Sequence, residues 1–299
     1  MNTKHTVLAA VVIVVLGISY FVFAPPAVGD PQLPTGPEAI ARGLYIWNAG
    51  GCGACHQRDG AEGPSGGYVI DSPFGGKFHV PNITPDKETG IAGWTGKDFL
   101  GALKHGRKPS GGFYWPAFPY RSYKDMKDED ALAVGAYLMS LPPINNKVPP
   151  HELPAWQFSF MMAGWNILAD FVEGTPPAVS NDPQMQRGAY LARVLGHCGE
   201  CHTPRNVIGM MQRNHEFEGA QIMTKKFPPI DVVPMSGWSQ EDFIALLQLG
   251  VKPDFDVVSG EMADVIEHTK LLTPEDQAAY ATFFTRGGAA ASSSAAAGK

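Results

Sequence analysis

The apolar residues of this chain fall into short stretches with helical spacing. No run of any length alternates with the period of two that a half-buried strand requires. The stretches follow an order that is used twice: a helix containing Gly43 or Gly188, a cysteine–histidine motif, long loops, a short helix, a loop and a final helix. Glycine (34) and proline (26) are plentiful, so much of the chain should be loop. The pattern predicts a mainly helical protein.

An internal repeat supports this order. Residues 94–99, Trp-Thr-Gly-Lys-Asp-Phe, match residues 238–243, Trp-Ser-Gln-Glu-Asp-Phe, at an offset of 144 residues. Gly43 and Gly188 stand at corresponding places before the two motifs, where the absence of a side chain lets the first helix of each unit cross the last one closely. One structural unit is therefore expected to occur twice.

The N-terminus contains a long apolar segment. Val7 to Ala24 is uncharged and largely apolar over 18 residues, just long enough to cross the hydrocarbon core. Lys4 on the short side favours a cytoplasmic N-terminus and export of the rest. A cleaved signal peptide is the alternative, although its apolar core is usually shorter and Pro25 and Pro26 are poorly placed for cleavage after Ala24. We expect a single anchor in a bacterial inner membrane, with the bulk in the periplasm.

Length and charge set the domain plan. A chain of 299 residues suggests about two domains of roughly 150 residues each, and the mild net charge of −6 argues against nucleic acid as a partner. The predicted divisions are a cytoplasmic N-terminus (1–6), the anchor or signal peptide (7–24), a spacer (25–37), a first domain (38–143), a linker with an apolar helix (144–183), a second domain (184–286) and a disordered tail (287–299).

The four cysteines carry the clearest chemistry. All lie in two Cys-x-x-Cys pairs, each followed directly by a histidine: Cys52, Cys55 and His56, then Cys198, Cys201 and His202. An isolated Cys-x-x-Cys is typical of a redox dithiol or half of a zinc site, and a disulfide framework would not require the histidines. The histidine at the fifth position, used twice, indicates covalent haem attachment. We expect two covalently bound haem c groups, with the cysteines as thioether donors and His56 and His202 as proximal iron ligands.

The identity of the sixth iron ligand indicates whether a haem transfers electrons or instead binds ligands or catalyses a reaction. In the second unit Met262 is the best candidate, in a loop before the last helix. The repeat places Phe118 at the matching position of the first unit, and phenylalanine cannot ligate iron. Met126, immediately before the final helix of that unit, is favoured instead. Otherwise the first haem lacks a methionine ligand, and His79 and His105 become the alternatives.

Three further side chains are candidates for the haem propionates. Arg205 can pair with a carboxylate bidentately. Trp94 and Trp238 can donate an indole N–H, with plain core burial as the competing interpretation. His197, directly before Cys198, is interpreted as a filler position of the turn.

Leu153 to Val172 is a second long apolar stretch. A second membrane crossing there would place Cys198 on the cytoplasmic side, away from haem attachment, and would bury Pro154 and Asp170 in lipid. We interpret the stretch as an inter-domain helix packed over a haem crevice. Location in the membrane interface, or docking of a partner, is the alternative.

Several segments together resemble a known family. They are Asn82-Ile83-Thr84-Pro85-Asp86 with Gly90-Ile91 and Trp94, Pro116-Ala117-Phe118-Pro119-Tyr120, and Cys198-Gly199-Glu200-Cys201-His202-Thr203-Pro204-Arg205-Asn206. Over residues 38–285 the chain is similar to the membrane-anchored di-haem cytochrome c subunits that accompany periplasmic alcohol, aldehyde and related dehydrogenases. The resemblance implies two tandem class I cytochrome c domains after an N-terminal transmembrane helix. Some members carry Phe-Pro-Tyr followed by a methionine at the position of Met126.

The resemblance also implies partners. Such proteins accept electrons from a dehydrogenase and pass them to a quinone, a small cytochrome or a terminal oxidase. An electron-transfer protein or subunit is therefore favoured over an enzyme. A di-haem enzyme, peroxidase-like or thiosulfate-oxidising, would need an open or displaceable position at one haem, and Phe118 is its only indication. A structural module is the least favoured, because it would not need covalent haem.

Overall fold

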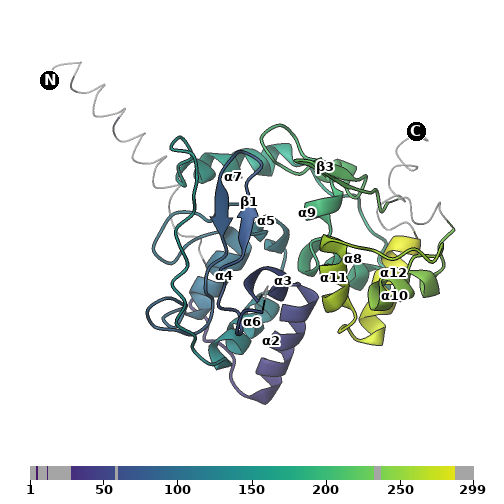
Figure 1. Ribbon diagram of the computed structural model, residues 1–299, viewed down its shortest axis with the longest axis horizontal. Coiled ribbons are helices and arrows are strands. Elements are labelled where there is room, and N and C mark those ends of the chain that lie inside the picture. Colours follow the sequence, from purple (N-terminus) through teal and green to yellow (C-terminus); the bar gives the residue numbers. More distant parts are fainter. Residues whose placement is uncertain (1–4, 6–11, 13–27, 58–59, 232–236, 287–299) are drawn as a thin grey trace.

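The computed structural model describes residues 28–57, 60–231 and 237–286, together with the isolated positions 5 and 12. Helices dominate this part of the chain, as the apolar pattern predicts. The elements form two halves that lie side by side, the first purple to teal and the second green to yellow in Figure 1.

The two halves use similar elements in a similar order. The first contains α2 (Pro37–Ala49), α3 (Gly53–His56), β1 (Val69–Asp71), β2 (Lys77–His79), α4 (Gly96–His105), α5 (Tyr120–Tyr123) and α6 (Asp128–Ser140). Helix α7 (Met161–Val172) follows in the linker. The second half contains α8 (Pro183–Tyr190), the π-helical turn η1 (Leu191–Leu195), α9 (Gly199–His202), the 3-10 turn η2 (Arg213–His215), β3 (Ala220–Ile222), β4 (Lys225–Phe227), α10 (Gln240–Leu249), α11 (Glu261–Thr269) and α12 (Pro274–Thr285).

The first and last helices of each half cross closely. A Cβ atom at Gly43 of α2 would lie 2.0 Å from the Ala133 carbonyl oxygen of α6, and one at Gly188 of α8 would lie 2.1 Å from the Ala279 carbonyl oxygen of α12. Neither distance leaves room for a methyl group. The close crossing predicted from the two glycines is confirmed.

Helices α4 (Gly96–His105) and α10 (Gln240–Leu249) have the same N-terminal and C-terminal caps. At each N-terminus a hydroxyl accepts from the backbone N–H of an aspartate, whose carboxylate accepts in return from the backbone of the capping residue: Thr95 with Asp98, and Ser239 with Asp242. Each helix ends at a glycine in the left-handed conformation, Gly106 (φ 60°) and Gly250 (φ 69°). The matched segments of the sequence thus fold into matched structures.

The structure also contains strands that the sequence pattern does not predict. β1 pairs antiparallel with β2, and β3 with β4, each in a two-stranded hairpin. Each strand has three residues, too few for a period of two to stand out. Lys77 of β2 also pairs with Glu152, which attaches the linker to the first hairpin.

The expected membrane anchor requires correction. In residues 28–57, 60–231 and 237–286, no helix combines the length and the apolar character that a bilayer crossing needs. The predicted segment 7–24 lies outside the described residues except for Val12, as does the tail 287–299. The structure therefore does not support a single N-terminal transmembrane helix, nor the inner-membrane location inferred from it.

The linker helix is shorter than the apolar stretch predicts. Only Met161–Val172 is helical, whereas Leu153–Phe160 forms turns, in which the Gln157 side chain donates to the Phe74 carbonyl (3.0 Å). The helix does contact both halves. The Tyr120 hydroxyl donates to Asn166 Oδ1 (2.8 Å), and Trp165 Nε1 donates to the Ile208 carbonyl (2.9 Å).

A buried ionic cluster fastens the end of this helix to both halves. Glu173, 2% exposed, accepts from Arg121 of α5 (2.9 Å) and from Arg213 of η2 (3.0 Å). Arg213 also donates to the Arg121 carbonyl (2.9 Å), and Arg121 to Asp170 (2.8 Å). Because the two guanidinium groups share one carboxylate, each half depends on the linker to neutralise a buried charge.

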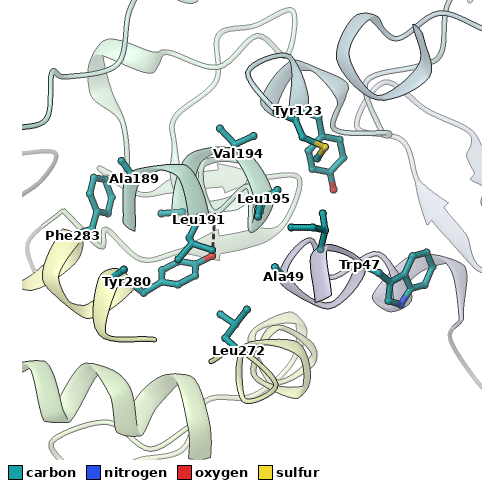
Figure 2. Packing of buried hydrophobic residues seen from close by; sticks show 14 of the residues in the cluster. Trp47, Ala49, Tyr123, Ala189, Leu191, Val194, Leu195, Leu272, Tyr280 and Phe283 are labelled. Atoms are coloured by element: carbon teal, nitrogen blue, oxygen red, sulfur yellow. Dashed lines mark hydrogen bonds between the residues drawn. The ribbon is translucent and has the colours of Figure 1, made fainter. Parts of the chain in front are cut away.

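One apolar core runs through the junction between the halves. Leu191, Leu195, Tyr280 and Phe283 of the second half belong to the same buried cluster as Trp47 and Ala49 of the first. Figure 2 shows this packing and the hydrogen bond from the Tyr280 hydroxyl to the Leu191 carbonyl, 2.9 Å long. The relative position of the halves is therefore set by buried packing as well as by polar contacts.

The polar contacts across the junction are reciprocal. The Tyr45 hydroxyl of α2 donates to Asp276 of α12, and the Tyr190 hydroxyl of α8 donates to Asp130 of α6 (2.6 Å). Each aspartate also pairs with an arginine of its own half: Arg187 with Asp276, and Arg42 with Asp130. Corresponding residues exchange corresponding contacts, as in a two-fold symmetric dimer interface.

Candidate functional site

The two cysteine–histidine motifs have the same local structure. In each, the first cysteine directly precedes a one-turn helix that contains the second cysteine and ends at the histidine: Cys52 before α3, and Cys198 before α9. Positions three apart on a helical turn lie on one face, so both cysteine sulfur atoms of a motif can bond to the same bound group. The histidine follows at once on the same turn.

The two histidine rings are oriented by equivalent hydrogen bonds. Nδ1 of His56 donates to the Pro81 carbonyl (3.0 Å), and Nδ1 of His202 donates to the Pro228 carbonyl (2.7 Å). A carbonyl can only accept, so Nδ1 carries the proton and Nε2 keeps its lone pair. Burial lowers the pKa of His56 to about 4 against the opposing effect of the Pro81 contact, and burial also lowers the pKa of His202. Both rings are therefore neutral at pH 7 with Nε2 free to bind a metal.

The cysteines are all thiols. Burial raises the pKa of Cys52 and of Cys198 to about 12, and that of Cys201 to about 11. None of the four, all within the described residues, is in a disulfide. Over the same described ranges, no group of three or more Cys, His, Asp or Glu side chains is arranged to hold a metal ion. Two thiols on one helical turn, beside a histidine whose Nε2 keeps its lone pair, fit a covalently attached haem.

The candidate sixth ligands differ in their surroundings. Met126 is 4% exposed and lies just after α5, where its backbone N–H donates to the Tyr123 carbonyl (2.9 Å). Met262 is partly buried and lies near the start of α11. The sequence pattern predicted a loop at this position. Gly260 (φ 63°) makes the turn that precedes this helix, which the sequence pattern did not predict. Phe118, at the position expected for a methionine, packs against Tyr123 with ring centroids 6.0 Å apart.

The histidines named as alternative ligands have other surroundings. His79 Nε2 contacts Glu152 Oε1 (2.9 Å) between β2 and the linker. His105 is the last residue of α4, and burial lowers its pKa.

The three propionate candidates have protein partners of their own. Arg205 forms an ion pair with Glu200 inside the second motif and donates to the Gly209 carbonyl (2.8 Å). Trp94 packs edge-on against Phe99 (ring centroids 5.2 Å), and Trp238 against Phe243 (6.3 Å). Core packing accounts for both tryptophans, and Arg205 braces the loop after Cys201. Contact of these side chains with propionates stays a prediction.

Sequence reasoning missed the side chains that join the two motifs. Ser122 of α5 donates to Glu200 of the second motif (2.6 Å). His197 Nε2 contacts the Gly50 carbonyl (3.3 Å), two residues before Cys52, and its ring packs edge-on against Tyr123 (ring centroids 5.6 Å). The only signal for His197 was that a glycine, Gly51, stands in the same place before Cys52.

Comparison with known proteins identifies the fold of the first half. The sequence profile of the cytochrome c family matches residues 40–142. Over 272 residues the chain is 39% identical to a diheme cytochrome c-type protein of Cereibacter sphaeroides, a match that covers 87% of this chain and 90% of that protein.

Other relatives are longer proteins. The chain is 36% identical over 269 residues to the fructose dehydrogenase cytochrome subunit of Gluconobacter japonicus, covering 85% of this chain and 54% of that protein. It is 35% identical over 261 residues to the gluconate 2-dehydrogenase cytochrome c subunit of Pantoea cypripedii, covering 82% of this chain and 58% of the relative. The chain thus spans just over half the length of these subunits. With its cytochrome c motifs and these matches, it belongs to the di-haem c-type cytochrome family that includes the cytochrome c subunits of dehydrogenases.

Proposed function

We propose that this chain binds two haem c groups and transfers electrons as a subunit or partner of a dehydrogenase. One observation carries the proposal: two equivalent one-turn motifs, each with two cysteines and a histidine whose Nδ1 donates to a proline carbonyl. A repeated, pre-oriented ligand set of this kind is suited to holding one cofactor in each half.

The proposed domains are residues 38–143 and 184–286, each a cytochrome c domain. The profile match supports the first. The matched helix crossings at Gly43 and Gly188, and the matched caps of α4 and α10, support the second. The segment 144–183 joins the two domains through α7 and the Glu173 cluster.

In this proposal each named residue has one role in binding haem. The four cysteines hold the haem groups, and His56 and His202 bind iron through Nε2. Met126 and Met262 fill the sixth positions, which favours electron transfer and raises the reduction potential relative to histidine ligation. Bound haem supplies the one-electron chemistry, while the surrounding protein excludes water and sets the potential.

Replacing a sixth ligand tests this assignment. Met126→Ala and Met262→Ala should each abolish methionine ligation at one haem, lower its reduction potential and open it to carbon monoxide in the reduced state. Absorbance spectra, carbon monoxide difference spectra and potentiometric titration of the holoprotein measure these changes. Met139→Ala, a partly buried residue of α6, is the matched control and should leave both haem spectra unchanged. A Met126→Ala protein with an unaltered first haem would contradict the ligand assignment.

A di-haem enzyme is the second candidate function. It is favoured by Phe118 alone, which occupies the place that the repeat would give to a methionine. In the structure Phe118 lies in an aromatic group with Tyr114 and Tyr123, and Met126 is buried in the core cluster that Phe118 packs against. Binding of carbon monoxide by the reduced wild-type protein would favour the enzyme over the electron-transfer protein.

The proposed electron donor is a dehydrogenase, and the acceptor a quinone, a small cytochrome or a terminal oxidase. The relatives named as subunits of fructose and gluconate dehydrogenases support the donor. An exposed apolar surface supports a protein partner, since Trp156, Phe160 and Phe171 are 57%, 61% and 82% exposed. A dehydrogenase that co-purifies with the chain should reduce its haem when given substrate. Haem that stays oxidised under those conditions would contradict this donor.

A further inference from the structure

The two haem-binding turns touch each other through His197. This residue directly precedes Cys198, and its Nε2–H donates to the Gly50 carbonyl at 3.3 Å. Gly50 lies two residues before Cys52. A connection of backbone and one hydrogen bond therefore runs from the first cysteine of one motif to the first cysteine of the other.

The backbone at His197 is strained, and the strain is specific to the second half. His197 has φ 38°, in the left-handed region, and Gly51 at the same place before Cys52 has φ 57°. Glycine adopts this conformation readily, whereas a side chain with a Cβ adopts it at a cost. The first motif shows that glycine is sufficient for the turn. A strained residue retained where glycine would suffice indicates a role for its side chain.

Other contacts already fix the junction between the halves. The reciprocal pairs Tyr45–Asp276 and Tyr190–Asp130 join the outer helices. The His197 contact breaks the two-fold pattern, because its counterpart Gly51 has no side chain to return the contact. These pairs join the halves without the His197 ring, which itself packs edge-on against Tyr123 of the first half (ring centroids 5.6 Å).

Contacts at the motifs themselves are also made from both sides. Ser122 of the first half binds Glu200 of the second motif, and His268 of the second half lies against the first motif, where a Cβ at Gly53 would be 3.2 Å from His268 Cε1. These contacts hold each motif against the opposite half. The His197–Gly50 bond differs from them because it joins one motif's turn directly to the other.

We propose that His197 is a positioning residue for electron transfer between the two haems, which it serves by fixing the two cysteine turns against each other and bridging them with its hydrogen bond. This inference rests on the proposed two-haem function. In the step concerned, one electron leaves the ferrous iron held by one motif, which becomes ferric, and reduces the ferric iron held by the other. No bond forms or breaks and no proton is transferred. The hydrogen bond from His197 to the Gly50 carbonyl connects the two cysteine turns, so the route between them needs no jump through space.

Two variants of the holoprotein separate this role from a structural one. His197→Gly removes the ring but restores the residue that the first motif uses in the same turn, so folding and haem attachment should be preserved. His197→Gln keeps an N–H donor on a side chain of similar reach. Pulse radiolysis injects single electrons, and the subsequent equilibration between the haems is followed by absorbance. Haem content, both reduction potentials and thermal stability are measured alongside.

We expect His197→Gly to slow equilibration several-fold at unchanged potentials and haem content. In the thermal stability, relief of the backbone strain opposes the loss of the ring's packing against Tyr123. His197→Gln should recover most of the rate. Equilibration at the wild-type rate in His197→Gly, or no recovery in His197→Gln, would overturn the role of His197 while leaving two-haem electron transfer intact. A wild-type protein with a single haem would instead overturn the proposed function, and this inference with it.

Discussion

Replacing Cys198 and Cys201 together by serine should remove one of the two haems and leave the other attached. Serine cannot form a thioether, and His202 alone has only its Nε2 to hold the cofactor. The second half should then lose the packing that a bound haem provides beside Cys198 and Cys201, while its own buried residues, among them Phe217 and Phe283, remain in the core. The first half, with its own motif at Cys52, should keep its haem.

The measurement is haem per chain, from the pyridine haemochrome spectrum and the mass of the intact protein. The matched variant replaces Cys52 and Cys55 by serine, and it should lose the other haem to the same extent. Replacing all four cysteines should give a protein with no covalent haem. A full complement of haem in either double variant would show that the motif concerned is not an attachment site.

The second large effect is expected at Glu173, which lies in no motif. Glu173→Gln removes the one carboxylate shared by Arg121 and Arg213, so two buried guanidinium groups lose their common counter-charge. Breaking a buried ionic cluster in this way typically costs about 3–5 kcal/mol of stability. Because Glu173 connects α7 with both halves, the loss should also weaken the contact between the halves.

Urea unfolding of the holoprotein measures the change. The control is Glu129→Gln, which removes an exposed carboxylate paired with Arg42 and should change the free energy of unfolding by less than about 1 kcal/mol. A Glu173→Gln protein as stable as the Glu129→Gln protein would mean that the buried arginines find other partners or water.

Local signals predicted the parts of the fold that depend on neighbouring residues. Gly43 and Gly188 indicated the close helix crossings, because only a missing side chain allows backbones to approach that far. The segments beginning at Trp94 and Trp238 both contain a capping box and fold alike. The Cys-x-x-Cys-His spacing also indicated that the second cysteine and the histidine of each motif share one helical turn.

The errors arose where the sequence carries weak or competing signals. The three-residue strands are too short to show a period. Met262 was placed in a loop because no helix was predicted between Gly250 and the last helix, yet α11 begins directly after Gly260. The apolar stretch at 153–172 was taken as one helix, although only Met161–Val172 is helical and Gln157, in its first part, donates to the Phe74 carbonyl of the first half.

Contacts between the halves were beyond the reach of sequence patterns. Tyr45 and Asp276 are 231 residues apart in the chain, and neither stands in a motif that indicates the other. His197 was interpreted as a filler of the turn before Cys198. Only the folded chain brings its ring to the Gly50 carbonyl and shows that the two cysteine turns adjoin.

The most direct test of the central claim is a coulometric redox titration of the wild-type holoprotein, followed by absorbance. If each motif holds one haem that works in electron transfer, the chain takes up two electrons in two one-electron steps, and the fully reduced protein binds no carbon monoxide. Uptake of a single electron per chain, or carbon monoxide binding at either haem, would contradict the account.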